Sequence, residues 1–415
     1  MKVLLLGNYA NDKQESMRRF ADVLTQQLPR LGLSVECLSP APVFGRLRRS
    51  AGGLGKWLGY VDKFVLFPRT LRNRIGHGDS GTLVHICDHS NSVYTRSLKG
   101  IPHLVTCHDL LAVRSALGEF PGHRTRGSGR LYQRWIMRGL NNAGHVACIS
   151  TATQRDIRRL TSLAPSQVSL VHNGLNHSYA PLTEVDAAAR LREASVRLGD
   201  KVVSKLEGGF ILHVGGNQWY KNRQGLIQIY ARLCEKMARP VTLVLAGKPF
   251  TPNMRRAIAN FHLEERVIEL NSVSNEDLRT LYCNAQLLLF PSFEEGFGWP
   301  IIEAQACGCP VVIANREPMT EVGGDAAVCF SIESTAASTD APLSTNSVDQ
   351  AAAAVLKTLL ETDEARSRRM QNGLRNAARF TTARMVESYV ELYQQISESA
   401  AEQPIRHREP VLEPQ

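Results

Sequence analysis

Short apolar runs alternate with amphipathic stretches through the first 180 residues of the chain. The runs predict strands buried on both faces, whereas residues 16–31 and 153–160 predict helices, with Ser150 or Thr151 placed to cap the second one. Strands that alternate with helices predict βαβ units and a parallel sheet. The strands predicted in this half are residues 2–6, 34–37, 83–87, 103–107, 145–149 and 168–171.

The alternation starts again after a polar, helix-forming connector at residues 183–205 and predicts a second doubly wound unit. Ser274 caps one of its helices, with Asp277 at the capping-box position. The strands predicted here are residues 210–214, 241–246, 266–270, 286–290 and 311–314. The helices predicted are residues 222–237, 253–260, 276–284, 300–306, 348–362 and 365–396, with a Ser-, Thr- and Ala-rich loop at 332–346.

The length of the chain agrees with this division. At 415 residues and 45.9 kDa, it exceeds the usual size of one domain and predicts two domains of about 200 residues each. The predicted fold class is α/β, with two Rossmann-like domains facing one another across a cleft, where such sheets bind ligands. The predicted division is 1–182, 205–380, a helical segment at 381–396, and a tail at 397–415 that is expected to be disordered.

Composition excludes several classes of protein. Hydrophobic residues make up 43% and charged residues 21%, near the globular average, which excludes wholesale disorder, collagen and coiled coil. The nine cysteines follow neither a disulfide framework nor zinc-ligand spacing, so reduced thiols in a cytoplasmic protein are expected. No signal segment and no apolar stretch of about 18 residues is present, which predicts a soluble or peripheral protein.

The net charge of +10 is concentrated in the first domain, since residues 1–180 carry 24 basic and 10 acidic side chains. Residues 44–76 hold eight basic residues, with Arg46, Arg48 and Arg49 among them, and one acidic residue. Residues 124–138 hold five arginines and no acidic residue. Interleaved aromatic residues are typical of a surface that contacts anionic lipid head groups. An ordinary solvated basic face is the alternative. Nucleic acid is disfavoured, because no nucleic-acid-binding module is recognisable.

The segment from residue 290 to 312 carries the most chemical information. A predicted strand enters a loop with Gly296 and Gly298, and Pro300 then opens a helix. The glycines allow close approach of a ligand to the backbone, and the helix N-terminus favours an anion such as diphosphate. Glu295 and Glu303 can each accept hydrogen bonds from sugar hydroxyls.

The spacing Glu295-(x7)-Glu303, with Gly296-Phe297-Gly298 inside it and residues 306–311 behind it, resembles the donor-site signature of the retaining glycosyltransferases of family 4. The resemblance extends over nearly the whole chain. It implies the two-Rossmann GT-B fold, with the helix at 381–396 crossing back to the N-terminal domain. It also implies transfer, with retention, of mannose or a similar hexose from a GDP- or UDP-linked sugar to a glycan or polyprenyl-linked acceptor. No metal or other cofactor is expected. The location that the resemblance implies is the cytoplasm, with the inner face of a membrane as one place within it.

The resemblance also assigns roles to single residues. Lys221 would contact the donor diphosphate, Glu295 and the backbone of Gly296, Phe297 and Gly298 would hold the transferred sugar, and Glu303 would bind the ribose. His108 would lie at the reacting centre, so that His108, Glu295 and Lys221 form the expected catalytic set. Backbone near Val273 would face the base. The residues expected along the acceptor side of the cleft are Asn8, Asp109 and Asn173.

Two departures from the family pattern are present. Tyr220 and Gly216 stand where many relatives carry an arginine, and whether Arg223 replaces it is an open question. The first loop has Glu15, Ser16 and Met17 where a glycine pair is common. The alternatives to a transferase are therefore a sugar phosphorylase or epimerase on the same scaffold, or a non-catalytic nucleotide-sugar-binding subunit. A nicotinamide-dependent oxidoreductase is disfavoured, because neither strand-end glycine continues as G-x-G-x-x-G.

Overall fold

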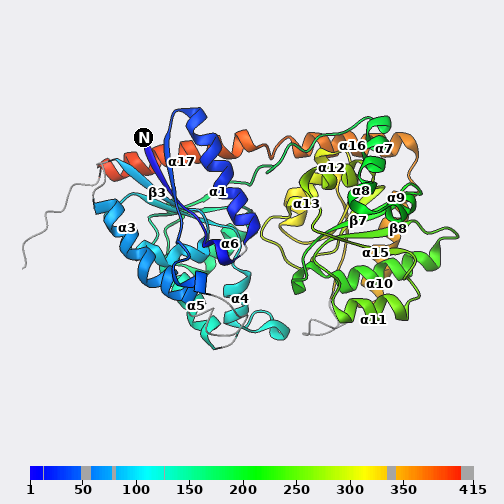
Figure 1. Cartoon of the computed structure of the whole chain (residues 1–415), viewed down its shortest axis with the longest axis horizontal. Helices are drawn as coiled ribbons and strands as arrows, with labels where there is room; N and C mark the ends of the chain where they lie inside the picture. The colour runs from blue at the N-terminus through cyan, green and yellow to red at the C-terminus, as the bar shows by residue number, and fades with distance from the viewer. Residues whose placement is uncertain (13, 48–57, 77–80, 126, 334–342, 403–415) are drawn as a thin grey trace, which may run out of the picture.

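The computed structural model describes residues 1–12, 14–47, 58–76, 81–125, 127–333 and 343–402. Two six-stranded sheets form the centres of two neighbouring domains (Figure 1). Every strand pair recorded in either sheet is parallel, so the predicted α/β class with two Rossmann-like units is confirmed.

The first sheet has the strand order β2-β1-β3-β4-β5-β6. β1, which lies between β2 and β3, places Leu4 opposite Glu36 on one side and Val84 on the other. Because successive side chains point to opposite faces, Leu4 and Leu6 join one core and Val3 and Leu5 join the other. The strands are β1 Lys2–Leu6, β2 Ser34–Leu38, β3 Thr82–Ile86, β4 His103–Cys107, β5 His145–Cys148 and β6 Val168–Leu170, and the helices are α1 Glu15–Gln27, α3 Phe67–Gly76, α4 Leu111–Leu117, α5 Ser128–Asn141 and α6 Thr151–Leu160.

The second sheet has the order β12-β11-β10-β7-β8-β9, so β7 and β10 lie at its centre. One large apolar core joins it to the surrounding helices. Its strands are β7 Phe210–Gly215, β8 Thr242–Gly247, β9 Val267–Asn271, β10 Leu287–Phe290, β11 Val311–Ala314 and β12 Val328–Phe330. Its helices are α10 Arg223–Lys236, α11 Pro252–Asn260, α12 Asn275–Asn284, α13 Trp299–Ala306, α14 Met319–Gly323 and α15 Thr345–Leu359, and the connector forms α7 Glu184–Glu193, α8 Ser195–Leu198 and α9 Asp200–Leu206.

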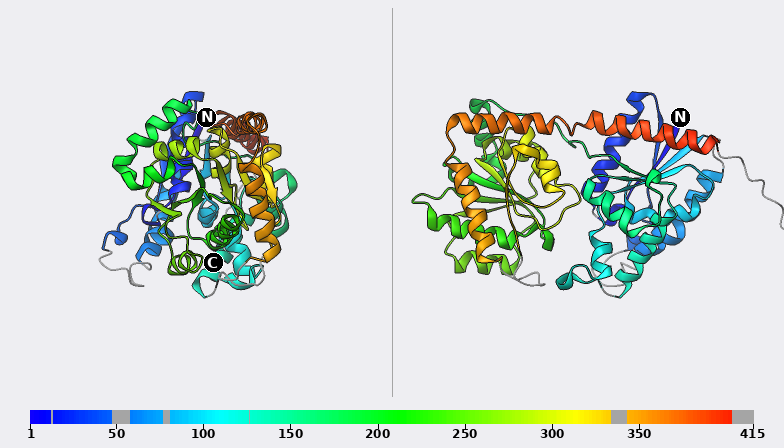
Figure 2. Two further views of the ribbon diagram at one scale, coloured as in Figure 1. Left: turned by 90° about the vertical axis from the view of Figure 1, so that its right-hand side faces the viewer. Right: turned by 180° about the vertical axis from the view of Figure 1, so that it is seen from behind.

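The last two helices join the domains along one side of the molecule. α16 (Asp363–Ala377) packs on the second domain and α17 (Thr382–Glu402) runs along the first (Figures 1 and 2). Tyr389 and Tyr393 of α17 reach beneath the first sheet and hydrogen-bond to Thr106 and His85 at 2.8 and 2.7 Å. These buried hydroxyl contacts fix α17 to the N-terminal domain.

The prediction of one helix over residues 365–396 is wrong. The helix ends at Ala377 and a new one begins at Thr382, because the peptide around Phe380 turns inward and its carbonyl accepts the amide of Leu175 at 3.0 Å. α17 also continues through residues 397–402, which contradicts disorder in that part of the predicted tail. Residues 403–415 lie outside the described part of the chain.

Several elements were not predicted from the pattern. Strand β12 has only three residues, too few for a periodicity to be recognised, α3 and α5 lie in stretches interpreted by their charge alone, and α4 has only seven residues. α15 begins at Thr345, three residues earlier than predicted, because Ser344 accepts the amide of Ser347 and caps it. Within the described part of the chain, no helix is both long and apolar enough to cross a bilayer. All nine cysteines are described and are free thiols.

Candidate active site

A cleft of about 970 Å³ lies between the carboxyl ends of the two sheets. One wall is formed by the first turn of α1 and by residues that follow β3 and β4, and the opposite wall by residues that follow β7, β8 and β9. Three of the predicted site residues, His108, Asp109 and Val273, line it directly. Doubly wound sheets bind their ligands at this edge.

A smaller cavity of about 530 Å³ adjoins the cleft, and Asp109 lines both. Glu295 lines this smaller cavity from the opposite domain. The two spaces therefore meet where the end of β4 faces the loop after β10.

The loop after β10 makes a close backbone contact with the N-terminal domain. A Cβ on Gly296 would lie 2.2 Å from the carbonyl oxygen of His108, so only glycine fits there. Gly298 has a φ of 101° and precedes α13, and Phe297 is buried against Phe380 with a ring-centroid distance of 5.7 Å. The loop thus exposes backbone beside His108, while the Phe297 ring anchors it.

Two predicted donor residues meet in this loop. The ammonium of Lys221 lies 2.6 and 2.8 Å from the two carboxylate oxygens of Glu295. Lys221 ends the turn Trp219–Lys221, and the next residue, Asn222, adopts a φ of 50° and donates its side-chain amide to the carbonyl of Pro291 at 2.9 Å. The loops after β7 and β10 are thereby tied together, and each charge neutralises the other until a ligand competes for it.

Glu303 lies in the first turns of α13, where its side chain is buried. The hydroxyl of Tyr282 donates to its carboxylate at 2.9 Å. Burial raises the pKa of Glu303 to about 7, an effect that the Tyr282 hydrogen bond and the charges of Arg19 and Lys221 only partly oppose. The carboxyl group can therefore gain or lose a proton near neutral pH.

His108 follows β4 and is buried at the edge of the cleft. Its Nε2 lies 2.9 Å from the carbonyl of Cys87, so Nε2 carries the proton and Nδ1 is a bare acceptor. Nδ1 has no hydrogen-bond partner among the described residues. Burial lowers the pKa of His108 despite the nearby charge of Asp88. The ring is thus a neutral acceptor for a ligand hydroxyl.

The other residues predicted on this side have different surroundings. Asn8 donates to the carboxylate of Asp88 at 2.5 Å and lies behind it, outside the cleft lining. Asp109 accepts the amide of Leu111 at 2.9 Å and so begins α4. Asn173 is fully buried, does not line the cleft, and neither of its side-chain atoms has a partner in the described chain. The structure therefore brings Asp109 and His108 together but leaves Asn8 and Asn173 outside the cleft.

Several cleft residues were missed by sequence analysis. Asp88, His89, Tyr132 and Gln133 line the N-terminal wall, and Arg19 of α1 faces them. Asp88 directly follows the predicted strand 83–87, as His108 directly follows the strand 103–107, so the strand end is a signal for it in the sequence. No comparable pattern in the sequence indicates the others, which reach the cleft from helices.

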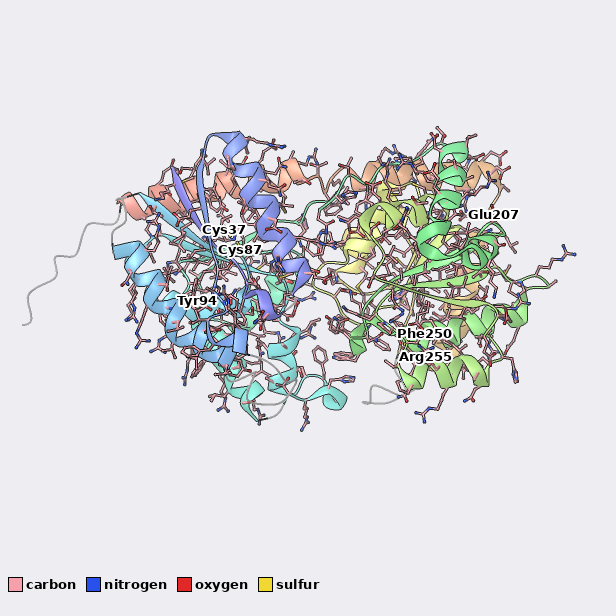
Figure 3. All side chains as sticks on the ribbon, viewed as in Figure 1. Cys37, Cys87, Tyr94, Glu207, Phe250 and Arg255 are labelled. Carbon is pink, nitrogen blue, oxygen red and sulfur yellow. The ribbon has the colours of Figure 1, made fainter. Side chains whose placement is uncertain are left out.

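Arg223 is buried behind the donor wall of the cleft and does not line it. Its Nη1 donates to the side chain of Asn217 and, at 2.8 Å, to the carbonyl of Lys248, while Nε and Nη2 have no partner among the described residues. Burial lowers its pKa to about 10. Its guanidinium lies 5.6 Å from the ring of Phe250, which Arg255 also approaches at 5.7 Å (Figure 3). Arg223 thus connects the loops after β7 and β8.

No group of three or more metal-ligating side chains is found in the described ranges. The absence of a metal requirement stays a prediction.

Two family models match the chain in succession. Glycosyl transferases group 1 match residues 199–376, and Glycosyltransferase Family 4 matches residues 17–179. Together the two matches cover most of the chain: the first includes the whole second sheet, and the second includes the first sheet except β1.

Curated relatives have low but extended similarity. The O-antigen chain mannosyltransferase B of Escherichia coli is 26% identical over 246 residues, covering 58% of this chain and 61% of the relative. The D-inositol 3-phosphate glycosyltransferase of Corynebacterium urealyticum is 27% identical over 410 residues, covering 91% and 90%. The chain therefore matches less than two thirds of the first relative's length.

Solved structures share the fold. HepE of Anabaena, in complex with UDP and glucose, has a TM-score of 0.67 at 16% identity, covering 95% of this chain and 100% of HepE. WaaG, a glycosyltransferase involved in lipopolysaccharide biosynthesis, has a TM-score of 0.67 at 13% identity, covering 95% and 99%. These similarities confirm the GT-B arrangement expected from the sequence.

Proposed function

The chain belongs to the group 1 glycosyltransferases of family 4, and on that premise we propose that it transfers a hexosyl group from a nucleotide diphosphate sugar to a glycan or lipid-linked acceptor in glycoconjugate synthesis. The observation that carries this proposal is the meeting of the Lys221–Glu295 pair with the end of β4. An ammonium for phosphate and a carboxylate for sugar hydroxyls lie beside a neutral histidine acceptor.

In the proposed reaction, these residues supply the charge that stabilises the departing phosphate. The bond between the anomeric carbon and the donor phosphate breaks, a bond from that carbon to the acceptor oxygen forms, and the acceptor proton passes to the departing phosphate. Lys221 leaves Glu295 to stabilise the phosphate, and Glu295 and the backbone at Phe297 and Gly298 bind the sugar. His108 accepts a sugar hydroxyl at Nδ1, and Glu303 accepts the ribose hydroxyls. Acceptor and leaving group share one face of the sugar, so configuration is retained.

The donor we propose carries GDP or UDP and mannose or a similar hexose. Two observations on other proteins support this choice. The E. coli relative is a mannosyltransferase by name, and HepE was solved with UDP and glucose. The backbone around Val273, which lines the cleft, is the proposed contact for the base.

A thermal-shift panel with UDP, GDP, ADP and their sugar conjugates tests the proposal. A ligand at 100 times its Kd stabilises by about 2.7 kcal/mol, a shift of a few degrees for a chain of this size. We expect one diphosphate to give this shift and Glu303→Ala to remove it. No shift with any of them contradicts the donor assignment. Turnover that needs free phosphate would indicate a phosphorylase, and binding without hydrolysis or transfer would indicate a non-catalytic subunit.

We also propose that the N-terminal domain contacts the anionic inner face of a membrane, where a polyprenyl-linked acceptor would lie. Helix α5 exposes Leu131 and Trp135, with exposed fractions of 51% and 40%. The Trp135 ring packs on Phe64 at a centroid distance of 6.0 Å, which joins α5 to the basic stretch of residues 44–76. The exposed arginines of α5 are Arg130, Arg134 and Arg138. Apolar side chains within a basic surface favour anionic lipid head groups.

Vesicle sedimentation tests this contact. The basic stretch 44–76 contains Arg46, Arg48 and Arg49. Arg46 is exposed, and Arg48 and Arg49 lie outside the described residues. Replacing all three by Glu should weaken sedimentation with phosphatidylglycerol vesicles, and Trp135→Ser should weaken it through lost apolar contact. Neutral phosphatidylcholine vesicles are the control. Unchanged sedimentation of both variants with the anionic vesicles contradicts the proposal.

A further inference from the structure

A loop of the N-terminal domain reaches an aromatic side chain of the donor domain. We call residues 118–125, which lie between α4 and α5, the strap; in Figures 1 and 2 the chain beyond α4 projects toward the other domain. The His123 ring stacks on the Trp219 ring with centroids 4.1 Å apart and an interplanar angle of 11°. Phe120 approaches the same ring at 4.9 Å. Two strap side chains thus contact one ring across the domain boundary.

The strap is held in shape by α4. Gly118 ends that helix with a φ of 89°. The Ser115 hydroxyl donates to the carbonyl of His123 and accepts the amide of Thr125 at 3.1 Å. The guanidinium of Arg114 lies 4.6 Å from the Phe120 ring centroid, within cation–π range. A loop tied at both ends has little freedom to lose when it contacts Trp219.

Arg114 also contacts the donor domain directly, which gives a second contact across the domain boundary. Arg114 pairs with Glu119 of the strap at 2.8 Å and with Glu294 of the donor domain at 3.0 Å. Glu294 immediately precedes Glu295 in the loop after β10. α4 therefore reaches both donor loops, one through Trp219 and the other through Glu294.

Trp219 is the first residue of the three-residue turn that ends in Lys221. Within the donor domain this turn is fixed at Tyr220, whose carbonyl accepts the amide of Phe293 at 2.7 Å. The indole of Trp219 points instead to the strap. One turn of backbone joins Trp219 to Lys221, and this turn is the link between the strap and the ammonium.

We propose that Trp219 is a positioning residue through which the strap holds Lys221 in place for the diphosphate of the donor. The inference rests on the proposed donor, since it concerns the affinity for a diphosphate. The affinity for the diphosphate then depends on the strap of the N-terminal domain, although the strap itself does not contact the diphosphate.

A double-mutant cycle across the domain boundary tests the inference. The four proteins are the full chain, Trp219→Ala, His123→Ala and the double variant, titrated with UDP and GDP and, as phosphate-free controls, with uridine and guanosine. His123→Ala keeps the backbone carbonyl that Ser115 binds. We expect each single change to raise the Kd of the bound diphosphate about tenfold, and the double change to add little, since contacting side chains are non-additive. Nucleoside affinity should stay unchanged.

Conservative and remote variants separate positioning from stability. Trp219→Phe keeps a ring for the strap and should restore most of the diphosphate affinity. Phe261→Ala removes an exposed aromatic ring elsewhere in the donor domain, one that does not line the cleft, and should leave affinity as it was. A purely structural role of Trp219 would lower the melting temperature without a selective loss of diphosphate binding.

The outcomes distinguish this inference from the proposed function. If the full chain binds neither diphosphate, the donor assignment fails and the inference fails with it. If the full chain binds one of them and His123→Ala binds it equally well, the strap does not hold Lys221 and only the inference is overturned. Additive effects of the two single changes would overturn it in the same way.

Discussion

The two walls of the cleft hold their polar groups in different ways. On the N-terminal wall, His108 is bound to the carbonyl of Cys87 and Asp109 to the amide of Leu111, so backbone of the same domain fixes both. On the donor side, Lys221 and Glu295 are bound to one another. A ligand can replace one partner of the Lys221–Glu295 pair. It has to fit the backbone-bound side chains of the N-terminal wall in the positions that they already have. The N-terminal wall is therefore a template, and the donor side holds exchangeable charge.

The largest effect is expected on the exchangeable side. Lys221→Met removes the only ammonium paired with Glu295 in the described chain, and we expect kcat/KM for sugar transfer to fall by roughly 100- to 1,000-fold, the usual loss when one transition-state charge contact is removed. The measurement is initial-rate transfer or donor hydrolysis with the nucleotide sugar that stabilises the full chain.

Loss of stability is a separate consequence of the same change, because Glu295 is left buried without its partner. Lys221→Met with Glu295→Gln should recover the melting temperature and not the activity. If the double variant recovered activity as well, the charge of Lys221 would not act on the donor, and the contrast between the two walls would be lost.

A smaller effect is expected at Glu303. Its pKa of about 7 means that the carboxylate form, which accepts ribose hydroxyls best, dominates only at higher pH. Glu303→Gln should therefore weaken binding of the nucleoside diphosphate about tenfold at pH 8 and much less at pH 6, a range that calorimetric titration covers. An equal loss at both pH values would contradict titration of Glu303 in the free protein.

The same raised pKa predicts the pH dependence of stability. The folded chain keeps the Glu303 proton up to about pH 7, whereas the unfolded chain loses it near the ordinary value of 4.5. The stabilisation is thus complete below pH 4.5 and lost as the pH rises toward 7, by up to about 3 kcal/mol. Urea unfolding of the full chain and of Glu303→Gln should show this loss in the first protein only.

The template wall predicts a smaller loss again. His108 is neutral because burial lowers its pKa, so it contributes one uncharged hydrogen bond through Nδ1. We expect His108→Ala to reduce kcat/KM by about fivefold, the size of one neutral hydrogen bond, with no limb near pH 6.5 in the pH profile of the full chain. A loss as large as that of Lys221→Met would show that this wall also carries charge during the reaction.

Sequence reasoning recovered the parts of the molecule that repeat a local pattern. Buried parallel strands are continuous apolar runs, so β4 and β11 were predicted to the residue. The helix of residues 365–396 was not divided correctly, because nothing local announces that Phe380 turns toward Leu175. The pairing of Lys221 with Glu295 depends in the same way on two loops 74 residues apart. Pairing is a tertiary property, whereas the motif around Glu295 is a local one.

The smallest effect is expected where the walls meet behind the cleft. Glu321 of α14 accepts hydrogen bonds from the amide of Thr151, at the N-terminus of α6, and from His172 at 2.7 Å. Burial acts to raise its pKa, but these donors lower it overall, so its stabilisation is present at neutral pH and lost as the pH falls through the lowered value. Glu321→Gln keeps the shape and removes the charge. We expect a loss of about 1 kcal/mol in urea unfolding at pH 7 and less than a threefold change in kcat/KM.

This last variant tests the comparison of the walls, because Glu321 joins the two domains, as the Lys221–Glu295 pair within the donor domain does not, and Glu321 does not line the cleft. If contact between the domains were all that mattered, Glu321→Gln would reduce activity as severely as a change at Lys221. If the exchangeable charge matters, stability and activity separate: Glu321→Gln lowers the first and spares the second. The contrast between a fixed template and a replaceable ion pair then explains why the charge of Glu321, which crosses the domain boundary, is structural, whereas the Lys221–Glu295 pair within the donor domain responds to a ligand.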